Sequence, residues 1–348
     1  MGDHGDHRGS VDHAALRSLG WDEWFEAAWR DLGAPGAPAR VRRIDRGWSS
    51  LLGDGVGTPA LRVRNLGADV AVGDWVVPSA DQERAEHVLA RRSAFVRRAS
   101  FEGARASAHT IAANIDVACL VHALTAPPNE RRLERELVLA YDSGARPVVV
   151  LTKADLSDDV DVAIQAVGQV VGDVPVRAVS GKTGAGLDSL RDEAAGHRTI
   201  ALLGASGVGK STLVNALVGR EVQSTGDVRV GDHRGRHTTS AAELIAMPDG
   251  GWLIDTPGLR AVSLWASGEG IERAFEDVFD LADHCRFRDC KHEDEPGCAV
   301  RAAVEAGQLD PRRVSSLARL VAEEAALEAE QRERVRALDR RRAPRPRP

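Results

Sequence analysis

A glycine-rich turn between an apolar run and a helix-forming run constrains the fold of this 348-residue chain more than any other feature. The sequence TIALLGASGVGKSTLVNAL predicts a buried strand, a turn of the form G-x-x-x-x-G-K-[ST] at Gly204–Thr212, and then a helix. Gly204, Gly207 and Gly209 allow the backbone to curl so that its N–H groups face an anion at the helix N-terminus. This order predicts an α/β domain with a phosphate site. A glycine-rich turn without a ligand is the alternative.

The residue types within this loop indicate how it would hold a nucleotide. Lys210 is expected to reach the β- and γ-phosphates, and Ser211 is expected to ligate Mg²⁺, which requires oxygen ligands. The expected phosphate-binding residues are Gly204, Ala205, Ser206, Gly207, Val208, Gly209, Lys210, Ser211 and Thr212.

A candidate base-recognition segment, TKAD at Thr152–Asp155, follows the apolar run RPVVVL. It would lie past the carboxyl end of a strand, where open α/β sheets bind ligands. A carboxylate at Asp155 can accept hydrogen bonds from N1–H and N2–H₂ of guanine, whereas adenine would leave it unpaired. Lys153 would lie along the base plane, next to Ala154. A four-residue match recurs by chance, so a surface loop is the alternative for this segment taken alone.

The first residue of this segment departs from the usual pattern, in which Asn stands at that position. Thr152 keeps a hydroxyl but has no amide donor. Whether Thr152 reaches the phosphate loop is therefore an open question at the level of sequence.

Two further segments carry groups suited to the same nucleotide. The run AVSGKTGAG resembles a loop that supports a guanine ring, and its candidate contacts are Ser180, Gly181 and Lys182. The run DTPG follows the predicted strand GWLI. Asp255 would hold Mg²⁺ through water, and the amide of Gly258 would contact the γ-phosphate.

The basic run RGRHTTS at Arg234–Ser240 is a candidate switch segment. Either Thr238 or Thr239 would close on the metal, and the sequence does not distinguish them. A solvated basic loop is the alternative.

These segments stand in a rotated order, because the base-recognition segment precedes the phosphate loop. Taken jointly, they resemble the circularly permuted GTPases of the RsgA/YjeQ family, the small-subunit-dependent GTPases of the ribosome. Permutation is compatible with an α/β domain, because the ends of a domain commonly lie close together at its surface. The resemblance implies a GTPase that binds the small (30S) ribosomal subunit and its rRNA late in assembly and is stimulated by the subunit.

Three of the four cysteines fall in one short segment, CRFRDCKHEDEPGC. Cys285, Cys290, His292 and Cys298 form a Cys₃His set that suits tetrahedral zinc. Four protein ligands leave no open position, so we expect one structural Zn²⁺ per chain. A disulfide is the alternative, but the sequence shows no signal peptide. Cys119 lies in an apolar run and is expected in the core.

The region between Ala39 and Ser107 shows short strand-like runs with turn signals and little helical periodicity. This rhythm fits a small β-barrel, and the resemblance implies an OB-fold that binds RNA. Its arginines are Arg40, Arg42, Arg43, Arg46, Arg62, Arg64, Arg91, Arg92, Arg97 and Arg98, and its large aromatics are Trp48, Trp75, Phe95 and Phe101. Because aromatics are sparse, we expect phosphate and shape contacts more than base stacking. A solvated barrel face is the alternative.

We therefore predict a multidomain chain. Its parts are a partly disordered N-terminal extension that runs into a helix (1–38), an OB-type β-barrel (39–108), a circularly permuted P-loop GTPase domain of α/β class (109–267), and an α-helical zinc-binding domain with a basic tail (268–348). A formal net charge of −6 excludes a generally basic nucleic-acid coat, and no apolar run is long enough to cross a membrane. We expect a cytoplasmic monomer.

The expected reaction is attack of water on the γ-phosphate of Mg·GTP, giving GDP and phosphate. Leu259 stands where many GTPases carry a water-orienting Gln, and its side chain cannot hydrogen-bond water. His237 is the candidate for that role, and an ordinary exposed His is the alternative. A nucleotide-gated RNA adaptor with incidental turnover and an ATP-using P-loop enzyme are the competing functions.

Overall fold

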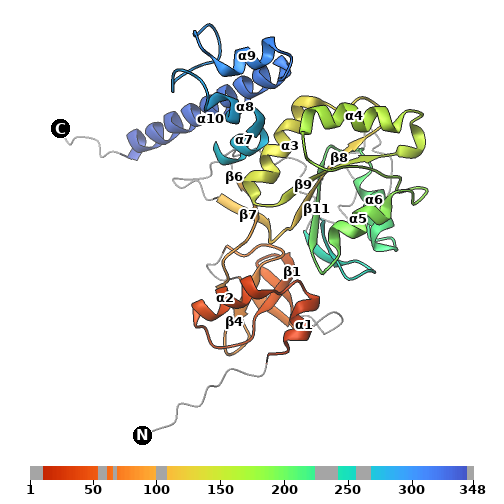
Figure 1. Cartoon of the computed structure of the whole chain (residues 1–348). Helices are drawn as coiled ribbons and strands as arrows, with labels where there is room; N and C mark the ends of the chain where they lie inside the picture. The colour runs from red at the N-terminus through yellow and green to blue at the C-terminus, as the bar shows by residue number, and fades with distance from the viewer. Residues whose placement is uncertain are drawn as a thin grey trace, which may run out of the picture. The chain divides into compact units, whose positions relative to one another are not determined.

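The computed structural model describes residues 11–53, 61–65, 69–98, 108–223, 242–255 and 268–342. The chain divides into two compact units (Figure 1). The first unit comprises Met1–Arg97, His109–Pro128 and Ser143–Ser263, and the second comprises Arg98–Ala108, Asn129–Asp142 and Leu264–Pro348. Within the described residues, no helix is both long and apolar enough to cross a membrane.

A parallel β-sheet forms the centre of the first unit. Its strands, in spatial order, are β10 (Val176–Ala178), β9 (Arg146–Thr152), β8 (Val117–Ala123), β11 (Thr199–Gly204) and β13 (Trp252–Asp255). The connecting elements in this unit are η1 (Ala154–Leu156), α4 (Val160–Val171), α5 (Leu187–Ala194) and α6 (Lys210–Val218). Val148 to Leu151 of β9 are all buried, as in a sheet covered on both faces. Cys119 of β8 is also buried, which confirms its predicted core position, and burial raises the pKa of its thiol to about 12.

The sheet continues beyond its parallel part into antiparallel strands. β12 (Glu243–Ala246) pairs with β13 on one edge and, at Glu243, with Arg43 of β1 (Ala39–Asp45) on the other. Arg42 reinforces this junction through an ion pair with Glu243 at 3.0 Å. The antiparallel strands between residues 39 and 88 and the parallel strands therefore belong to one hydrogen-bonded sheet.

Short antiparallel strands make up the N-terminal β region, in agreement with the turn signals of its sequence. They are β2 (Trp48–Leu52), β3 (Leu61–Arg64), β4 (Trp75–Pro78) and β5 (Ala85–Val88), and β6 (Ala94–Arg98) pairs separately with β7 (Ala108–Ala113). β1 pairs with both β2 and β4. Alternate residues point inward, and their core consists of Ala39, Val41, Leu51, Val63, Val70, Val76 and Ala85.

Two short helices precede this β region. Asp12 caps the N-terminus of α1 (His13–Ser18), and Asp22 caps that of α2 (Glu23–Leu32). Each aspartate accepts hydrogen bonds from two amides of the first helical turn. The helix predicted within the N-terminal extension is thus present. Trp21 packs edge-on against Trp75 of β4, with ring centroids 4.7 Å apart, which anchors the helices to the β region.

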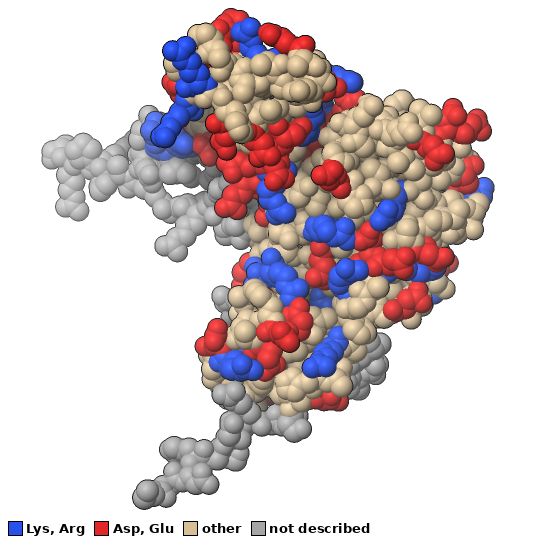
Figure 2. All heavy atoms as spheres, viewed as in Figure 1, with Lys and Arg blue, Asp and Glu red and all other residues tan. Residues whose placement is uncertain are grey.

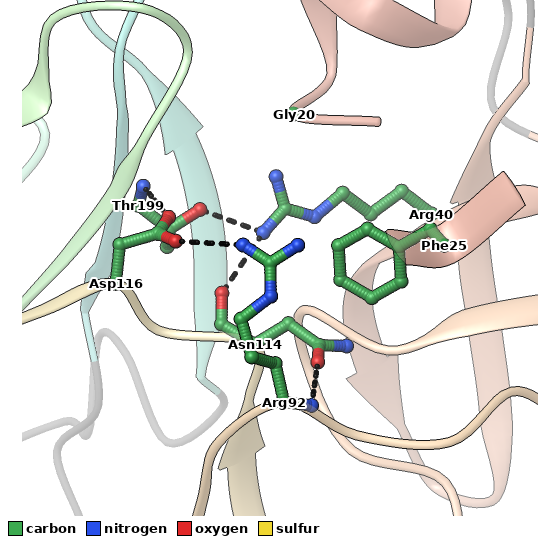
Figure 3. A pocket seen from close by; sticks show the side chains of 7 residues that line it. All are labelled: Gly20, Phe25, Arg40, Arg92, Asn114, Asp116 and Thr199. Atoms are coloured by element: carbon green, nitrogen blue, oxygen red, sulfur yellow. Dashed lines mark hydrogen bonds and ion pairs between the residues drawn. The ribbon is translucent and has the colours of Figure 1, made fainter. Parts of the chain in front are cut away.

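A buried arginine joins three segments of the first unit (Figure 3). The Arg40 guanidinium donates to the carbonyls of Leu19 and Asn114 and, at 2.6 Å, to the Thr199 hydroxyl at the start of β11. Burial lowers the pKa of Arg40 to about 10, and the nearby Asp116 carboxylate opposes this shift. Because its two terminal nitrogens donate to distant parts of the chain, Arg40 connects the N-terminal helices and β1 to the parallel sheet.

The second unit is helical around a core of its own. Its helices are α3 (Glu130–Ser143, in this unit up to Asp142), α7 (Gly268–Ala274), α8 (Glu276–Ala282), α9 (Ala299–Glu305) and α10 (Pro311–Arg342). Core residues include Val138, Phe275, Val278, Val300 and Leu317. Glu134 of α3 is nearly buried and accepts a hydrogen bond at 2.8 Å from Arg319 of α10. α3 therefore packs with the C-terminal helices, although it lies between β8 and β9 in the sequence.

Candidate functional site

Four sequence motifs lie at the carboxyl ends of neighbouring parallel strands. TKAD follows β9, the serine segment follows β10, the phosphate loop follows β11, and Asp255 ends β13. Strand ends at this edge of an open α/β sheet form ligand sites. Sheet order thus brings together segments that stand in rotated order along the chain.

The phosphate loop needs glycine at the end of β11. Gly204 has φ +154°, and a Cβ added there would lie 2.4 Å from the carbonyl oxygen of Val121 on β8. Gly207 and Gly209 also have positive φ, at +81° and +95°. A left-handed backbone at these positions favours glycine, so the three glycines are required by the turn itself.

The phosphate loop carries backbone amides that have no acceptor among the described residues. Within the described part of the chain, the backbone N–H groups of residues 206–209 have no hydrogen-bond acceptor. The Lys210 ammonium lies over the same turn and donates to the carbonyls of Gly204, at 2.8 Å, and Ala205, at 2.5 Å. A curl of free amides beside an ammonium group fits an anionic phosphate. Ser206 and Thr212 are exposed, and Val208 and Ser211 are half-buried.

Thr152 does reach the phosphate loop. Its buried hydroxyl lies 2.5 Å from the carbonyl oxygen of Val208 and 3.2 Å from that of His122. Lys153, in a left-handed conformation, donates from Nζ to the Gly207 carbonyl at 3.0 Å. The hydroxyl therefore makes the connection for which an Asn side chain is usual.

The Asp155 carboxylate is exposed and is oriented from behind by Ser180. The Ser180 hydroxyl donates to Asp155 Oδ1 at 2.6 Å and accepts from the amides of Lys182 and Thr183 at 3.2 and 3.1 Å. Ser180 itself is buried, so its position is fixed by packing. Gly181 lies so close to the first turn of α6 that a Cβ there would be 3.2 Å from the backbone of Thr212. The serine segment thus joins the base-recognition segment to the phosphate loop.

Two residues near the site did not stand out in the sequence. The Asn215 amide on α6 accepts from the backbone N–H of Val222 and Gln223, both at 2.9 Å, and donates to the Gln223 carbonyl at 2.8 Å. The side chain of Gln223 then donates to Asp255 Oδ2. An Asn inside a helix is a weak signal, because its side chain competes for backbone hydrogen bonds. Gln223 carries no signal from sequence alone.

Some predicted residues lie outside the described part of the chain. These are His237, Thr238, Thr239, Gly258 and also Leu259, and their roles stay predictions.

The Cys₃His residues converge in the second unit. The ligand atoms of Cys285, Cys290, His292 and Cys298 all lie within 4.8 Å of one another. The Cys285 and Cys298 sulfurs are 3.9 Å apart, and His292 Nδ1 is 3.7 and 3.5 Å from them. A disulfide needs sulfurs about 2 Å apart, and all four cysteines of the chain are free thiols.

These separations fit a tetrahedral ion. Zn–S bonds of about 2.3 Å and a Zn–N bond of about 2.0 Å imply S···S edges of about 3.8 Å and S···N edges of about 3.5 Å. The Glu295 carboxylate holds the loop between Cys290 and Cys298, because it accepts hydrogen bonds from the backbone amides of Lys291 and Glu293 at 2.9 and 3.0 Å. The four side chains could therefore hold a metal ion with no change of fold.

Comparison with known proteins gives a consistent answer. The RsgA GTPase family model matches residues 88–265. A protein of Streptomyces coelicolor named small ribosomal subunit biogenesis GTPase RsgA is 43% identical over 336 residues, which is 94% of this chain and 91% of that protein. A protein of the same name from Methanosarcina acetivorans is 42% identical over 265 residues, which is 75% of this chain and 71% of that protein.

Two solved structures share the fold. YjeQ from Thermotoga maritima superposes with a TM-score of 0.61 at 24% identity and covers 83% of this chain and 98% of its own. The circularly permuted GTPase YloQ gives a TM-score of 0.58 at 25% identity, over 83% of this chain and 95% of its own. The rotated order of the motifs is therefore that of a circularly permuted GTPase fold.

Proposed function

This chain belongs to the RsgA GTPase family and is a GTP hydrolase, and we propose that it acts on the small ribosomal subunit late in the assembly of that subunit. The subunit would stimulate hydrolysis of GTP to GDP and phosphate, and the protein would leave after hydrolysis. The names of the relatives fit this function and not an RNA adaptor or an ATP-using enzyme.

The observation that carries the nucleotide part is the contact between base-recognition and phosphate segments. Thr152 and Lys153 donate to the carbonyls of Val208 and Gly207 in the phosphate loop. One ligand spanning both segments would have a base at Asp155 and phosphates beside Lys210.

Guanine selectivity would come from the Asp155 carboxylate. Ser180 already donates to Oδ1, and each carboxylate oxygen has a second lone pair for N1–H or N2–H₂ of the base. Adenine offers no matching pair of donors on that edge, so the Asp155 carboxylate would receive no such pair of hydrogen bonds from adenine. Gly181 and Lys182 would lie beside the base, and Ala154 would lie beneath it.

Phosphate binding would use the backbone amides of residues 206–209, which have no acceptor in the described part of the chain, and the ammonium of Lys210. Lys210 would exchange its two carbonyl acceptors for phosphate oxygens, a charge-assisted and therefore stronger pair. The hydroxyl of Ser211, the Asp255 carboxylate through water, and Thr238 or Thr239 would hold Mg²⁺. When bound, that ion would offset the negative charge that develops on the β- and γ-phosphates.

Positioning of the attacking water would fall to His237, since Leu259 has no polar group. His237→Ala should leave GTP binding nearly intact and slow turnover stimulated by the subunit. Full turnover in this variant would remove His237 from the mechanism.

The Cys₃His cluster would hold one Zn²⁺ in a structural role. All four ligands come from the protein, so no coordination position remains for a substrate. The metal would fix the segment between α8 and α9.

The rRNA contacts would be made by the N-terminal β region, which we assign to an OB-type barrel, and by local basic patches elsewhere. On the face shown in Figure 2, Lys and Arg side chains are interspersed with Asp and Glu side chains, with no uniform basic field. The protein would act on ribosomal subunits in the cytoplasm, as a monomer.

GTP hydrolysis measured with and without purified small subunits tests the proposal. We expect strong stimulation by the subunit, and binding that is tighter with a non-hydrolysable GTP analogue than with GDP. Equal rates with and without subunits would contradict the proposed partner. Equal competition of labelled GTP by ATP would contradict guanine recognition.

A further inference from the structure

Trp48 lies with two arginines on the outer face of strands β2 and β3. It pairs with Arg64 across the strands, and Arg62 precedes Arg64 by two residues, so the three side chains project from the same face. The guanidinium carbons of Arg62 and Arg64 lie 5.1 and 4.9 Å from the centroid of the Trp48 ring. Trp48 is half-buried, and both arginines are exposed.

The other described aromatics of this region have different surroundings. Trp75 and Phe95 are buried in the core, with 0% and 2% exposure. Trp48 alone among these three presents part of its ring to solvent. Trp48 is therefore not part of the hydrophobic core of the β region.

Arg62 and Arg64 differ from Arg43 in their ion pairs within the described part of the chain. Among the described residues, no carboxylate forms an ion pair with Arg62 or Arg64. Arg43 lies in the same row as Ser50 and Arg62 and is tied at 3.8 Å to Glu243. The acidic residues in these rows are Asp45, which pairs with Trp48, and Glu243, which pairs with Arg43. An aromatic ring flanked by two guanidinium groups without a carboxylate partner among the described residues suits a ligand with a flat ring and an adjacent anion.

We propose that Trp48, Arg62 and Arg64 form a stacking site for an unpaired base of single-stranded RNA. The base would stack on the Trp48 ring or on the guanidinium planes beside it, and the arginines would contact the flanking phosphates. This inference rests on the proposed function for the identity of the partner as RNA. It adds a base contact to a surface for which sparse aromatics suggested phosphate contacts.

Binding of a fluorescein-labelled hexauridylate to the full chain, followed by anisotropy at low salt, tests the site. Trp48→Ala should weaken binding roughly 5- to 150-fold, as expected for loss of one stacked base. Trp48→Phe should retain most of the affinity, because it keeps an aromatic face.

Trp24→Ala is the matched control. Trp24 is 40% exposed and lies 5.4 Å below Arg92 in the same type of cation–π pair, but on α2. We expect its RNA affinity to equal that of the unaltered chain. Equal losses in Trp24→Ala and Trp48→Ala would overturn the site, as would unchanged binding in Trp48→Ala.

A hexamer with the same phosphates but without bases separates stacking from charge. It should bind the unaltered chain as weakly as hexauridylate binds Trp48→Ala, and its affinity should not change in that variant. By contrast, Arg62→Gln with Arg64→Gln should reduce the salt dependence of binding by neutralising fewer phosphates. A glutamate-rich peptide that binds as tightly as RNA, with the same dependence on Trp48, would assign the surface to acidic protein instead.

Thermal unfolding of each variant controls for loss of fold, and Trp48→Phe keeps the test informative if Trp48→Ala is unstable. Failure of this experiment leaves subunit-stimulated hydrolysis untouched, because neither subunit nor GTP is used. Conversely, hexauridylate binding through Trp48 without subunit stimulation would contradict only the proposed function.

Discussion

The nucleotide site of the first unit and the Cys₃His cluster of the second differ in what holds them together. At the nucleotide site, hydrogen bonds among protein groups already connect the loops, for example from Thr152 to Val208 and from Ser180 to Asp155. In the cluster, three thiols and an imidazole face one another within 4.8 Å. The first arrangement is held by the chain's own contacts. The second brings together four groups whose mutual contacts are weak unless an ion lies between them.

This difference implies opposite responses to loss of ligand. The scaffold of the nucleotide site should persist without nucleotide, whereas the segment around the cluster should loosen without metal, because metal-binding free energy is folding free energy. The predictions below test that contrast, from the largest expected effect to the smallest.

Cys290→Ser should have the largest effect. Loss of one thiolate should lower zinc from one ion per chain to a small fraction in elemental analysis. The second unit should lose stability on a scale of up to roughly 10 kcal/mol, the range of structural zinc in small domains. Limited proteolysis should then cut between α8 and α9, while GDP binding persists. Normal zinc content in this variant would refute the assignment, and Cys119→Ser is the control that should retain the metal.

Asp155→Asn should have the next largest effect, on nucleotide choice. Two charge-assisted hydrogen bonds to guanine are lost, which should weaken GTP binding by about 3 kcal/mol or more, over 100-fold. Xanthosine triphosphate should gain, because its carbonyl at C2 accepts from the new amide. Competition binding measures both. Unchanged GTP affinity would mean that another group recognises the base.

Lys210→Ala removes one ammonium from the phosphates. The expected loss in GTP affinity is about 1.5–3 kcal/mol, roughly 10- to 150-fold, with a smaller loss for GDP. The fold should be unaffected, because the Gly204 and Ala205 carbonyls that Lys210 contacts can turn to water. Titration calorimetry with both nucleotides checks this, and Lys291→Ala, altered at an exposed lysine of the second unit, provides the comparison. Equal losses for GTP and GDP would place the ammonium away from the γ-phosphate.

Thr152→Val should have the smallest effect. It deletes the hydroxyl that bonds to the Val208 carbonyl and nearly keeps the side-chain volume. We expect a loss of about 1 kcal/mol, roughly fivefold in GTP affinity. Thr152→Ser keeps the hydroxyl and should bind normally. A loss as large as that of Lys210→Ala would mean that the phosphate loop depends on this one bond, contrary to the proposed bracing by several contacts.

The same comparison explains what could be predicted from sequence. The cysteine cluster is local, since all four ligands fall within the segment Cys285–Cys298. Their spacing in the sequence was therefore enough to predict the set. The phosphate loop was equally local. The convergence of Thr152, Ser180 and Asp255 depends on strand order, which the motif sequence suggested through a known permutation but did not determine.

Other features had no sequence signal. Arg40 was grouped with surface arginines, although it is buried and bonds to Thr199, 159 residues away. Burial of a single arginine depends on which carbonyls and hydroxyls meet it in three dimensions. Gln223 likewise depends on Asn215 and Asp255, which are distant or unremarkable in the sequence. The inclusion of α3 among the C-terminal helices follows from side-chain packing at Val138 and Glu134, which periodicity does not reveal.

The pairing of β12 with β1 has a consequence for attempts to shorten the protein. Unpaired strand edges are templates for aggregation, and β1 occupies the outer edge of β12 at Glu243. A chain cut before the parallel sheet would uncover that edge and strip Glu243 of both arginine partners. Such a fragment should self-associate through its newly exposed strand β12. The parallel sheet should therefore not be stable as a separate domain.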